Sequence, residues 1–87
     1  SKEYSKAVEV YLPKTVHFVT CTFGELKDGK VIEKGTKCKM ARGQMVRWLA
    51  EHNIENPEDI REFSDLDYRF EPELSDQDHF IFVKGEK

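Results

Sequence analysis

The run TVHFVTCTF, at residues 15–23, restricts the fold of this chain more than any other stretch. It is rich in β-branched and aromatic residues, which favour strands. Successive side chains of a strand point to opposite sides, so the run has two faces. One face carries Val16 and Phe18, and the other carries His17, Val19, Cys21 and Phe23. Both faces are largely apolar, which is typical of a strand inside a sheet.

Further strands are predicted on either side of this run in the sequence. The turn KDGK and the short run VIEKG follow it, and together they predict a hairpin over residues 15–34. Near the other end of the chain, HFIFVKG at 79–85 alternates between two sets of side chains and predicts a closing strand. An extended aromatic stretch around Tyr68 and Phe70 precedes it.

The clearest helix is predicted over residues 38–52, because residues on one side of it recur at helical spacing. These core-facing positions are Cys38, Ala41, Met45, Trp48, Leu49 and His52. A second, short helix is predicted to start at Asn56 as the N-cap, with Pro57 in the first position and Asp59 in the third. A short N-terminal helix is predicted from the spacing of Tyr4, Ala7 and Val8, ending before Pro13.

These elements predict one α+β domain that spans residues 1–87. A small antiparallel sheet, made of the hairpin and the C-terminal strands, is expected to pack against the main helix and the short helices. A chain of 87 residues has room for a single small core. No stretch has the length and apolar character of a membrane span, and the first residues lack the apolar centre of a signal peptide, so we expect a cytoplasmic protein with no membrane partner.

Positive charge is concentrated in one part of the chain. Residues 27–47 carry seven cations against Asp28 and Glu33, whereas residues 51–78 carry eleven carboxylates against Arg61 and Arg69. A local basic region of this kind suits DNA or a phosphate-bearing ligand. An ordinary solvated surface would give the same pattern.

The basic residues of the main helix are the candidate nucleic-acid or phosphate-binding residues. Lys39, Gly43 and Arg47 recur at every fourth position, which places them on one stripe. Arg42 falls between this stripe and the core face, and Lys37 precedes the helix; both complete the candidate set. A glycine inside a helix costs about 1 kcal/mol relative to alanine. Gly43 therefore needs a reason, and the close approach of a phosphate or of another backbone would supply one.

A helix-turn-helix reading of residues 39–62 is disfavoured. The second helix is acidic through Glu58, Asp59 and Glu62, so it would repel DNA in the recognition role. Any contact with DNA is therefore expected from the first helix and the basic hairpin.

No self-sufficient catalytic, metal or cofactor site is predicted. The three histidines, His17, His52 and His79, stand apart from one another, and the chain has neither a phosphate-binding loop nor a G-x-S-x-G motif. Cys21 and Cys38 are expected to be reduced thiols. The lysines beside Cys38 could make it sensitive to peroxide, although a core-facing thiol is also explained by packing. The domain alone is not expected to be an enzyme.

Several motifs together strongly resemble the C-terminal part of the YaaA family of bacterial peroxide-stress proteins. They are SKEYSKAV, FGELKDGK, KMARG with Met45 and Arg47 after it, IENPEDIREF, DYRFEPELS and HFIFVKG. The resemblance covers nearly the whole chain. Family members are longer, which implies that this chain is a C-terminal fragment whose first partner is the N-terminal portion of the same protein; the absence of an initial Met agrees.

The resemblance also implies a function. It implies a cytosolic protein, induced by hydrogen peroxide, that limits oxidative damage by lowering free intracellular iron and that has been associated with DNA binding. The basic motif of the family falls on Lys39, Arg42, Gly43 and Arg47.

Two other hypotheses remain beside nucleic-acid binding. The whole protein could be an enzyme on a nucleotide-like or phosphorylated substrate, with Lys39 and Arg42 as electrostatic clamps and the catalytic groups in the N-terminal part. Alternatively, the basic residues could be structural: Arg42 and Arg47 would pair with the acidic segment 55–78, and Gly43 would let a strand pack closely.

Overall fold

The computed structural model describes residues 2–3, 7–12, 17–32 and 35–85. The strands are β1 (Lys2–Glu3), β2 (Ala7–Leu12), β3 (His17–Lys27), β4 (Lys30–Ile32), β5 (Arg69–Phe70) and β6 (His79–Gly85). The helices are α1 (Gly35–His52) and α2 (Pro57–Ile60), with short 3-10 turns η1 (Asp65–Asp67) and η2 (Pro72–Leu74). None of the described helices is long and apolar enough to cross a membrane.

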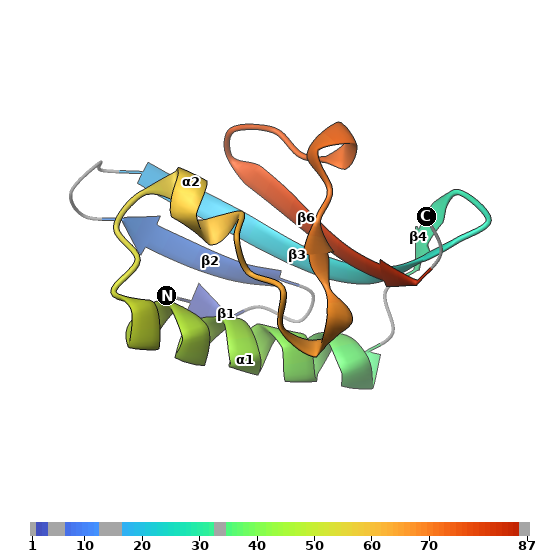
Figure 1. Cartoon of the computed structure of the whole chain (residues 1–87), viewed down its shortest axis with the longest axis horizontal. Coiled ribbons are helices and arrows are strands. Elements are labelled where there is room, and N and C mark those ends of the chain that lie inside the picture. Colours follow the sequence, from blue (N-terminus) through green and yellow to red (C-terminus); the bar gives the residue numbers. More distant parts are fainter. Residues whose placement is uncertain (1, 4–6, 13–16, 33–34, 86–87) are drawn as a thin grey trace.

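The predicted α+β class is confirmed, but the sheet is mixed rather than antiparallel. Its strand order is β1-β2-β3-β6-β5, and β4 pairs with β3 outside this path. All described pairings are antiparallel except β3 with β6, which run parallel and bring Cys21 opposite Phe80. The parallel pair arises because α1 and the segment after it carry the chain back along the sheet before β6 begins (Figure 1).

The N-terminal helix prediction is wrong, because residues 7–12 form strand β2. Val8, Val10 and Leu12 are buried while Tyr11 is exposed, which is the period of two that a strand requires. Pairing with β3 in the register Val10 to Val19 overrides the weak helical spacing. Tyr4, on which that prediction also rested, lies outside the described residues.

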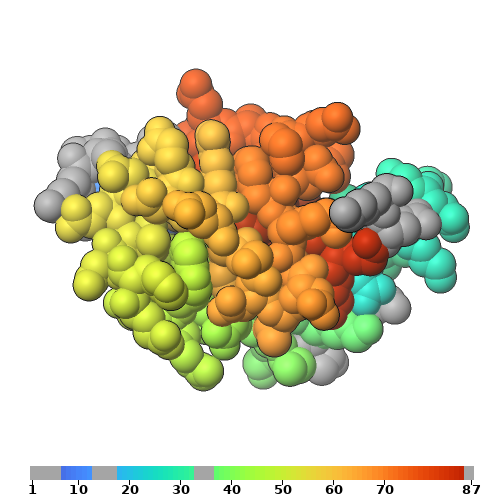
Figure 2. Space-filling view, viewed as in Figure 1, coloured from blue at the N-terminus to red at the C-terminus, as the bar shows by residue number. Residues whose placement is uncertain are grey.

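The helices lie on one side of the sheet. In Figure 1, α2 and the segment that leads to β5 are drawn in front of the strands, and α1 runs along the lower side of the picture. Figure 2 shows the same face covered by their side chains. The core between the layers includes an aromatic cluster in which Phe23 lies 5.3 Å from Phe82, 5.4 Å from Tyr68 and 5.9 Å from Phe63, measured between ring centres.

The core face of α1 is predicted correctly at four of its six positions. Cys38, Ala41, Met45 and Leu49 are buried. Trp48 is partly buried and packs against this core, with its ring edge-on to Phe63. His52 is exposed, because it is the last residue of the helix, and its Nδ1 lies 3.0 Å from the carbonyl oxygen of Trp48.

The prediction that both faces of β3 are buried is only half correct. Val19, Cys21 and Phe23 are fully buried under the helical layer, whereas Phe18 on the other face is 54% exposed. Its ring lies 4.6 Å from that of Tyr11, which is also exposed. Among the described residues no helix covers this side, so aromatic side chains there stay in contact with solvent. Val16 lies outside the described residues.

The predicted extended stretch around Tyr68 and Phe70 is a strand only at β5, between η1 and η2, whereas the predicted turn, closing strand and second helix are found. Asp28 and Gly29 both have positive φ, 52° and 76°, as the predicted Asp-Gly hairpin turn requires. The closing strand is β6, and it matches the predicted range of residues. Helix α2 begins at Pro57 after Asn56, as predicted, but the Asn56 side chain makes no capping hydrogen bond.

Candidate functional site

Three of the five candidate binding residues gather on one exposed side of α1. Lys39, Gly43 and Arg47 line a hollow of about 430 Å³, together with Met40, Gln44 and Leu66. We call this the basic hollow. One cation lies on each side of the glycine along the helix, as the spacing of the sequence predicts.

The space beside Gly43 is open. Gly43 is exposed, and a Cβ atom built on it would meet nothing within 4 Å among the described residues beyond its chain neighbours and the nearby backbone of its own helix. The hypothesis that Gly43 lets a strand pack closely is therefore not supported within this part of the chain. What remains is a helix backbone that solvent, or a ligand, can reach directly.

The opposite wall of the basic hollow comes from η1. Leu66 has φ 57° and ψ 31° and Asp67 has φ 66°, a left-handed conformation that costs a residue such as leucine about 1 kcal/mol or more. Such strain persists only where the surroundings hold it. Gln44 on α1 contributes, because its Nε2 donates a hydrogen bond of 2.8 Å to Oδ2 of Asp65. Sequence reasoning missed Gln44 and Leu66, and no spacing pattern pointed to them.

Arg47 is joined to this wall indirectly. Its Nη1 donates a hydrogen bond of 3.4 Å to Oε1 of Gln44, which in turn holds Asp65. The structural hypothesis expects such a link to the acidic segment, but here it passes through an amide. The long, exposed bond leaves the guanidinium group accessible.

The other two candidate residues lie elsewhere. Arg42 is only 6% exposed, on the core side of α1. Lys37 is exposed but forms an ion pair of 2.9 Å with Oε1 of Glu25 on β3, and it lines a neighbouring hollow. A phosphate in the basic hollow would therefore meet Lys39 and Arg47 first.

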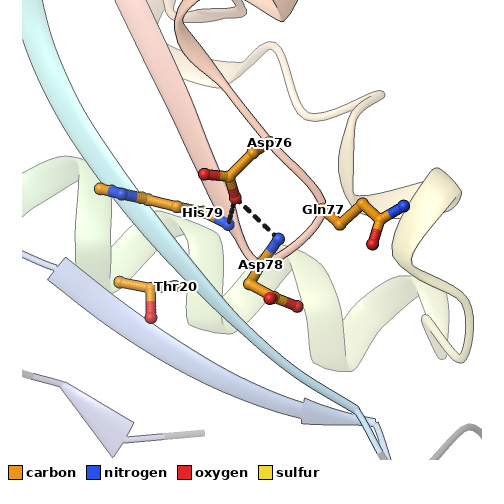
Figure 3. Close-up of a pocket in the computed structure, with 5 residues that line it drawn as sticks. All are labelled: Thr20, Asp76, Gln77, Asp78 and His79. Carbon is orange, nitrogen blue, oxygen red and sulfur yellow. Dashed lines mark hydrogen bonds between the residues drawn. The ribbon is translucent and has the colours of Figure 1, made fainter.

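A separate hollow of about 560 Å³ lies at the start of β6 (Figure 3). Thr20, Asp76, Gln77, Asp78 and His79 line it. Oδ1 of Asp76 accepts hydrogen bonds from the backbone N–H groups of Asp78 and His79, at 2.9 and 2.8 Å, and these bonds lower the pKa of Asp76. The carboxylate thus stabilises the turn into β6.

The side chain of His79 contacts β3. Its Nε2 lies 2.6 Å from Oγ1 of Thr22, on the face of the sheet opposite the helices. The histidine ring and the Gln77 side chain point to different sides of the hollow (Figure 3). Within the described residues, no group of three or more His, Cys, Asp and Glu side chains could hold a metal ion. The basic hollow, which joins two cations and an exposed glycine, is the candidate site.

The family model for peroxide stress protein YaaA matches residues 1–74 of this chain. The chain belongs to the YaaA family. Its curated relatives carry the family designation UPF0246. It is 54% identical over 85 residues to UPF0246 protein DSY0297 of Desulfitobacterium hafniense, a match that covers 98% of this chain and 34% of that protein.

Two further relatives match this chain with similar sequence identity and over a similar share of both proteins. The chain is 51% identical over 86 residues to a UPF0246 protein of Lachnoclostridium phytofermentans, covering 99% of the chain and 34% of the relative. With UPF0246 protein LBA1843 of Lactobacillus acidophilus the identity is 48% over 82 residues, covering 94% and 32%. The YaaA-family chain described here thus spans about a third of the length of these relatives.

Both cysteines of this YaaA-family chain are free thiols, as predicted, and both are buried. Sγ of Cys38 donates a hydrogen bond of 3.0 Å to the carbonyl oxygen of Phe23, and the residue is 2% exposed. Burial raises the pKa of the Cys21 thiol to about 12. The burial of Cys38 and its hydrogen bond fit the packing explanation of this residue better than a role as an exposed, reactive thiol.

Proposed function

We propose that the basic hollow contacts phosphate groups of nucleic acid in the peroxide-stress protein to which this chain belongs. The observation that carries the proposal is the exposed Gly43 between Lys39 and Arg47, with open space on the outer side of the helix at the position where a side chain would begin. The helix backbone is open where the two cations can hold a polyanion.

Gly43 supports the proposal because its presence in the helix is not explained by the stability of the fold. In the middle of an 18-residue helix it costs about 1 kcal/mol relative to alanine, and it relieves no contact within the described chain. A ligand that approaches the helix closely would give the glycine a role. Lys39 and Arg47 lie two turns apart, about 12 Å along the axis, so they can contact different phosphates.

The proposal predicts binding that depends on salt and tolerates changes of DNA sequence. Each phosphate contact adds about −0.9 to the slope of log K against log salt concentration, so two contacts give a slope of about −1.8. Arg42 is buried and Lys37 is bound to Glu25. We therefore propose that these two residues add to the positive potential around the basic hollow rather than contact a phosphate directly.

The experiment is a heteronuclear NMR titration of this chain with a short DNA duplex, at low and then moderate salt. We expect shifts at Lys39, Gly43 and Arg47 that fade as salt rises. Arg47→Glu is expected to weaken binding about tenfold or more. Arg61→Glu, at an exposed arginine just after α2 and outside the basic segment, is the control with the same change of charge. Equal loss in both variants would show diffuse attraction and would contradict a local site.

The same titration separates the nucleic-acid proposal from the enzyme hypothesis. A single nucleotide such as AMP offers phosphate without a duplex. Shifts of the basic hollow with AMP, but none with the duplex, would favour Lys39 as an electrostatic clamp for a phosphorylated substrate and would reject nucleic-acid contact.

For the whole protein we propose the family's cellular role, the lowering of free iron in the cytoplasm during peroxide stress. The support is the match to the peroxide stress protein model. Chelatable iron would be measured in cells that lack the full-length protein and are complemented with either the wild type or Arg47→Glu. Equal iron levels with and without the protein would contradict this role.

A further inference from the structure

The hydroxyl group of Tyr68 is buried without a partner. Tyr68 is 2% exposed, and within the part of the chain that the structure describes its oxygen makes no hydrogen bond. Leaving a buried hydroxyl unpaired costs about 1–3 kcal/mol. Such a group calls for a partner beyond these residues, and an ordered water or a ligand can supply one.

Tyr68 lines a hollow that adjoins the basic hollow. This tyrosine hollow has a volume of about 210 Å³ and is lined by Lys37, Met40, Leu66, Asp67, Tyr68 and Lys84. Met40 and Leu66 line both hollows and are 60% and 43% exposed, so they form the ridge between them. The tyrosine hollow is thus a distinct place, next to the proposed nucleic-acid contacts.

The polar groups of the tyrosine hollow are mostly hydrogen-bond donors. Nζ of Lys84, on β6, lies 5.0 Å from the centre of the Tyr68 ring. Nζ of Lys37 is bound to Glu25 at 2.9 Å, and an ammonium group has three N–H donors in all. Lys37 is also in the first turn of α1, where the helix dipole is positive. Asp67 supplies the one carboxylate among the lining residues.

The Tyr68 hydroxyl is itself available as a donor at neutral pH. Burial raises its pKa above the ordinary value of 10.0, and the nearby Cys38 and Glu25 raise it further. Two ammonium groups, one of them paired with Glu25, and a phenol that keeps its proton offer several donors to a ligand with acceptor oxygens.

We propose that the tyrosine hollow binds the oxyanion of a phosphate group, with Tyr68 as a hydrogen-bond donor and Lys37 and Lys84 as the positive charges. This site goes beyond the nucleic-acid contacts proposed at Lys39, Gly43 and Arg47 and does not depend on them. The phosphate can be a free small anion, or it can belong to a nucleic acid.

The test is a titration with inorganic phosphate, followed by NMR at constant ionic strength with chloride as the balancing anion. In the wild-type chain we expect saturable shifts at Lys37, Tyr68 and Lys84. Tyr68→Phe keeps the aromatic ring and removes only the hydroxyl, so we expect a folded protein of equal or higher stability and at least tenfold weaker phosphate binding.

Two matched variants complete the design. Tyr11→Phe makes the same change at an exposed tyrosine on β2 and should leave phosphate affinity unchanged. Lys84→Gln should weaken binding while the hydroxyl remains. An absence of shifts in the wild type, or equal affinity in Tyr68→Phe, would overturn the proposal.

The DNA duplex distinguishes the source of the phosphate and separates this inference from the proposed function. Shifts at Tyr68 with the duplex, lost in Tyr68→Phe, would assign the site to a nucleic-acid phosphate, whereas shifts with inorganic phosphate alone would assign it to a free anion. Arg47→Glu should weaken duplex binding at the basic hollow about tenfold or more while inorganic phosphate still binds at Tyr68. Loss of duplex binding in the wild type, with phosphate binding retained, would reject the proposed function alone.

Discussion

Gly43 shows how a single residue can separate stability from function. It lies exposed within α1, with open space around it, so alanine would add helix propensity without a clash. We predict that Gly43→Ala raises the free energy of unfolding by about 1 kcal/mol. Urea denaturation followed by circular dichroism measures this change. The same variant should bind the DNA duplex less tightly, whereas a destabilised Gly43→Ala protein would show that an unseen contact requires the glycine.

Cys21 gives a prediction about alkaline pH. Its pKa is raised by burial from 9.0 to about 12, so above pH 9 the unfolded chain loses this proton while the folded chain keeps it. Stability should therefore be unaffected by this group below pH 9 and fall by up to about 1.4 kcal/mol per pH unit between pH 9 and 12. Urea unfolding of the wild type and Cys21→Ala, at pH 8 and 10.5, isolates this group. Equal pH dependence in the two proteins would contradict the assignment.

At the level of residues, the sequence identified the candidate site only in part. The spacing of Lys39, Gly43 and Arg47 was enough to place them together, because helical periodicity is local. The burial of Arg42 and the ion pair of Lys37 with Glu25 depend on where the sheet lies against α1, which spacing does not specify. Tyr68 was visible only as an aromatic residue, since its unpaired hydroxyl is a property of tertiary packing.

The hairpin between β3 and β4 supplies a prediction opposite in sign to that for Gly43. Gly29 has φ 76° at an exposed turn, and among the described residues nothing beyond its chain neighbours lies within 4 Å of the position of its missing Cβ. Alanine would therefore meet only backbone strain there, and Gly29→Ala should lower the free energy of unfolding by about 1 kcal/mol. Urea denaturation of this variant beside Gly43→Ala compares one substitution in two backbone conformations. If both variants were more stable than the wild type, the positive φ of Gly29 would not be required by the turn.

At the level of elements, the predictions succeeded where local signals were strong. The Asp-Gly turn, α1 and β6 each carry a pattern that a few neighbouring residues determine. Strand β2 was predicted as helix because Tyr4, Ala7 and Val8 have helical spacing, and only the pairing of β2 with β3 decides against a helix. The parallel pair of β3 and β6 could not be predicted, because the direction of a strand depends on the path of the chain between the two.

Within the described residues, the helical layer covers one face of the sheet, whereas the other face is open to solvent around Phe18 and Tyr11, and the same substitution should report on each face. Phe82 is fully buried and contacts the rings of Phe23, Phe63 and Phe70. Phe82→Ala should cost about 3–5 kcal/mol, which is a large part of the stability of a domain this small. Phe18→Ala, at a ring 54% exposed, should cost much less. Thermal unfolding compares them, and similar losses would mean that the open face is also packed.

Strand β3 is the common partner of β2, β4 and β6, and its pairing with β6 joins residues far apart in the sequence, such as Cys21 and Phe80. The chain between them must close into a long loop before this pair can form, and loop closure has an entropic cost that is met before the strands gain any contacts. We therefore expect folding in milliseconds to seconds, as for domains dominated by non-local contacts, rather than in the microseconds of helical bundles. In a stopped-flow experiment, the fluorescence change of Trp48 as it packs against the core should therefore occur at the rate of this slow step.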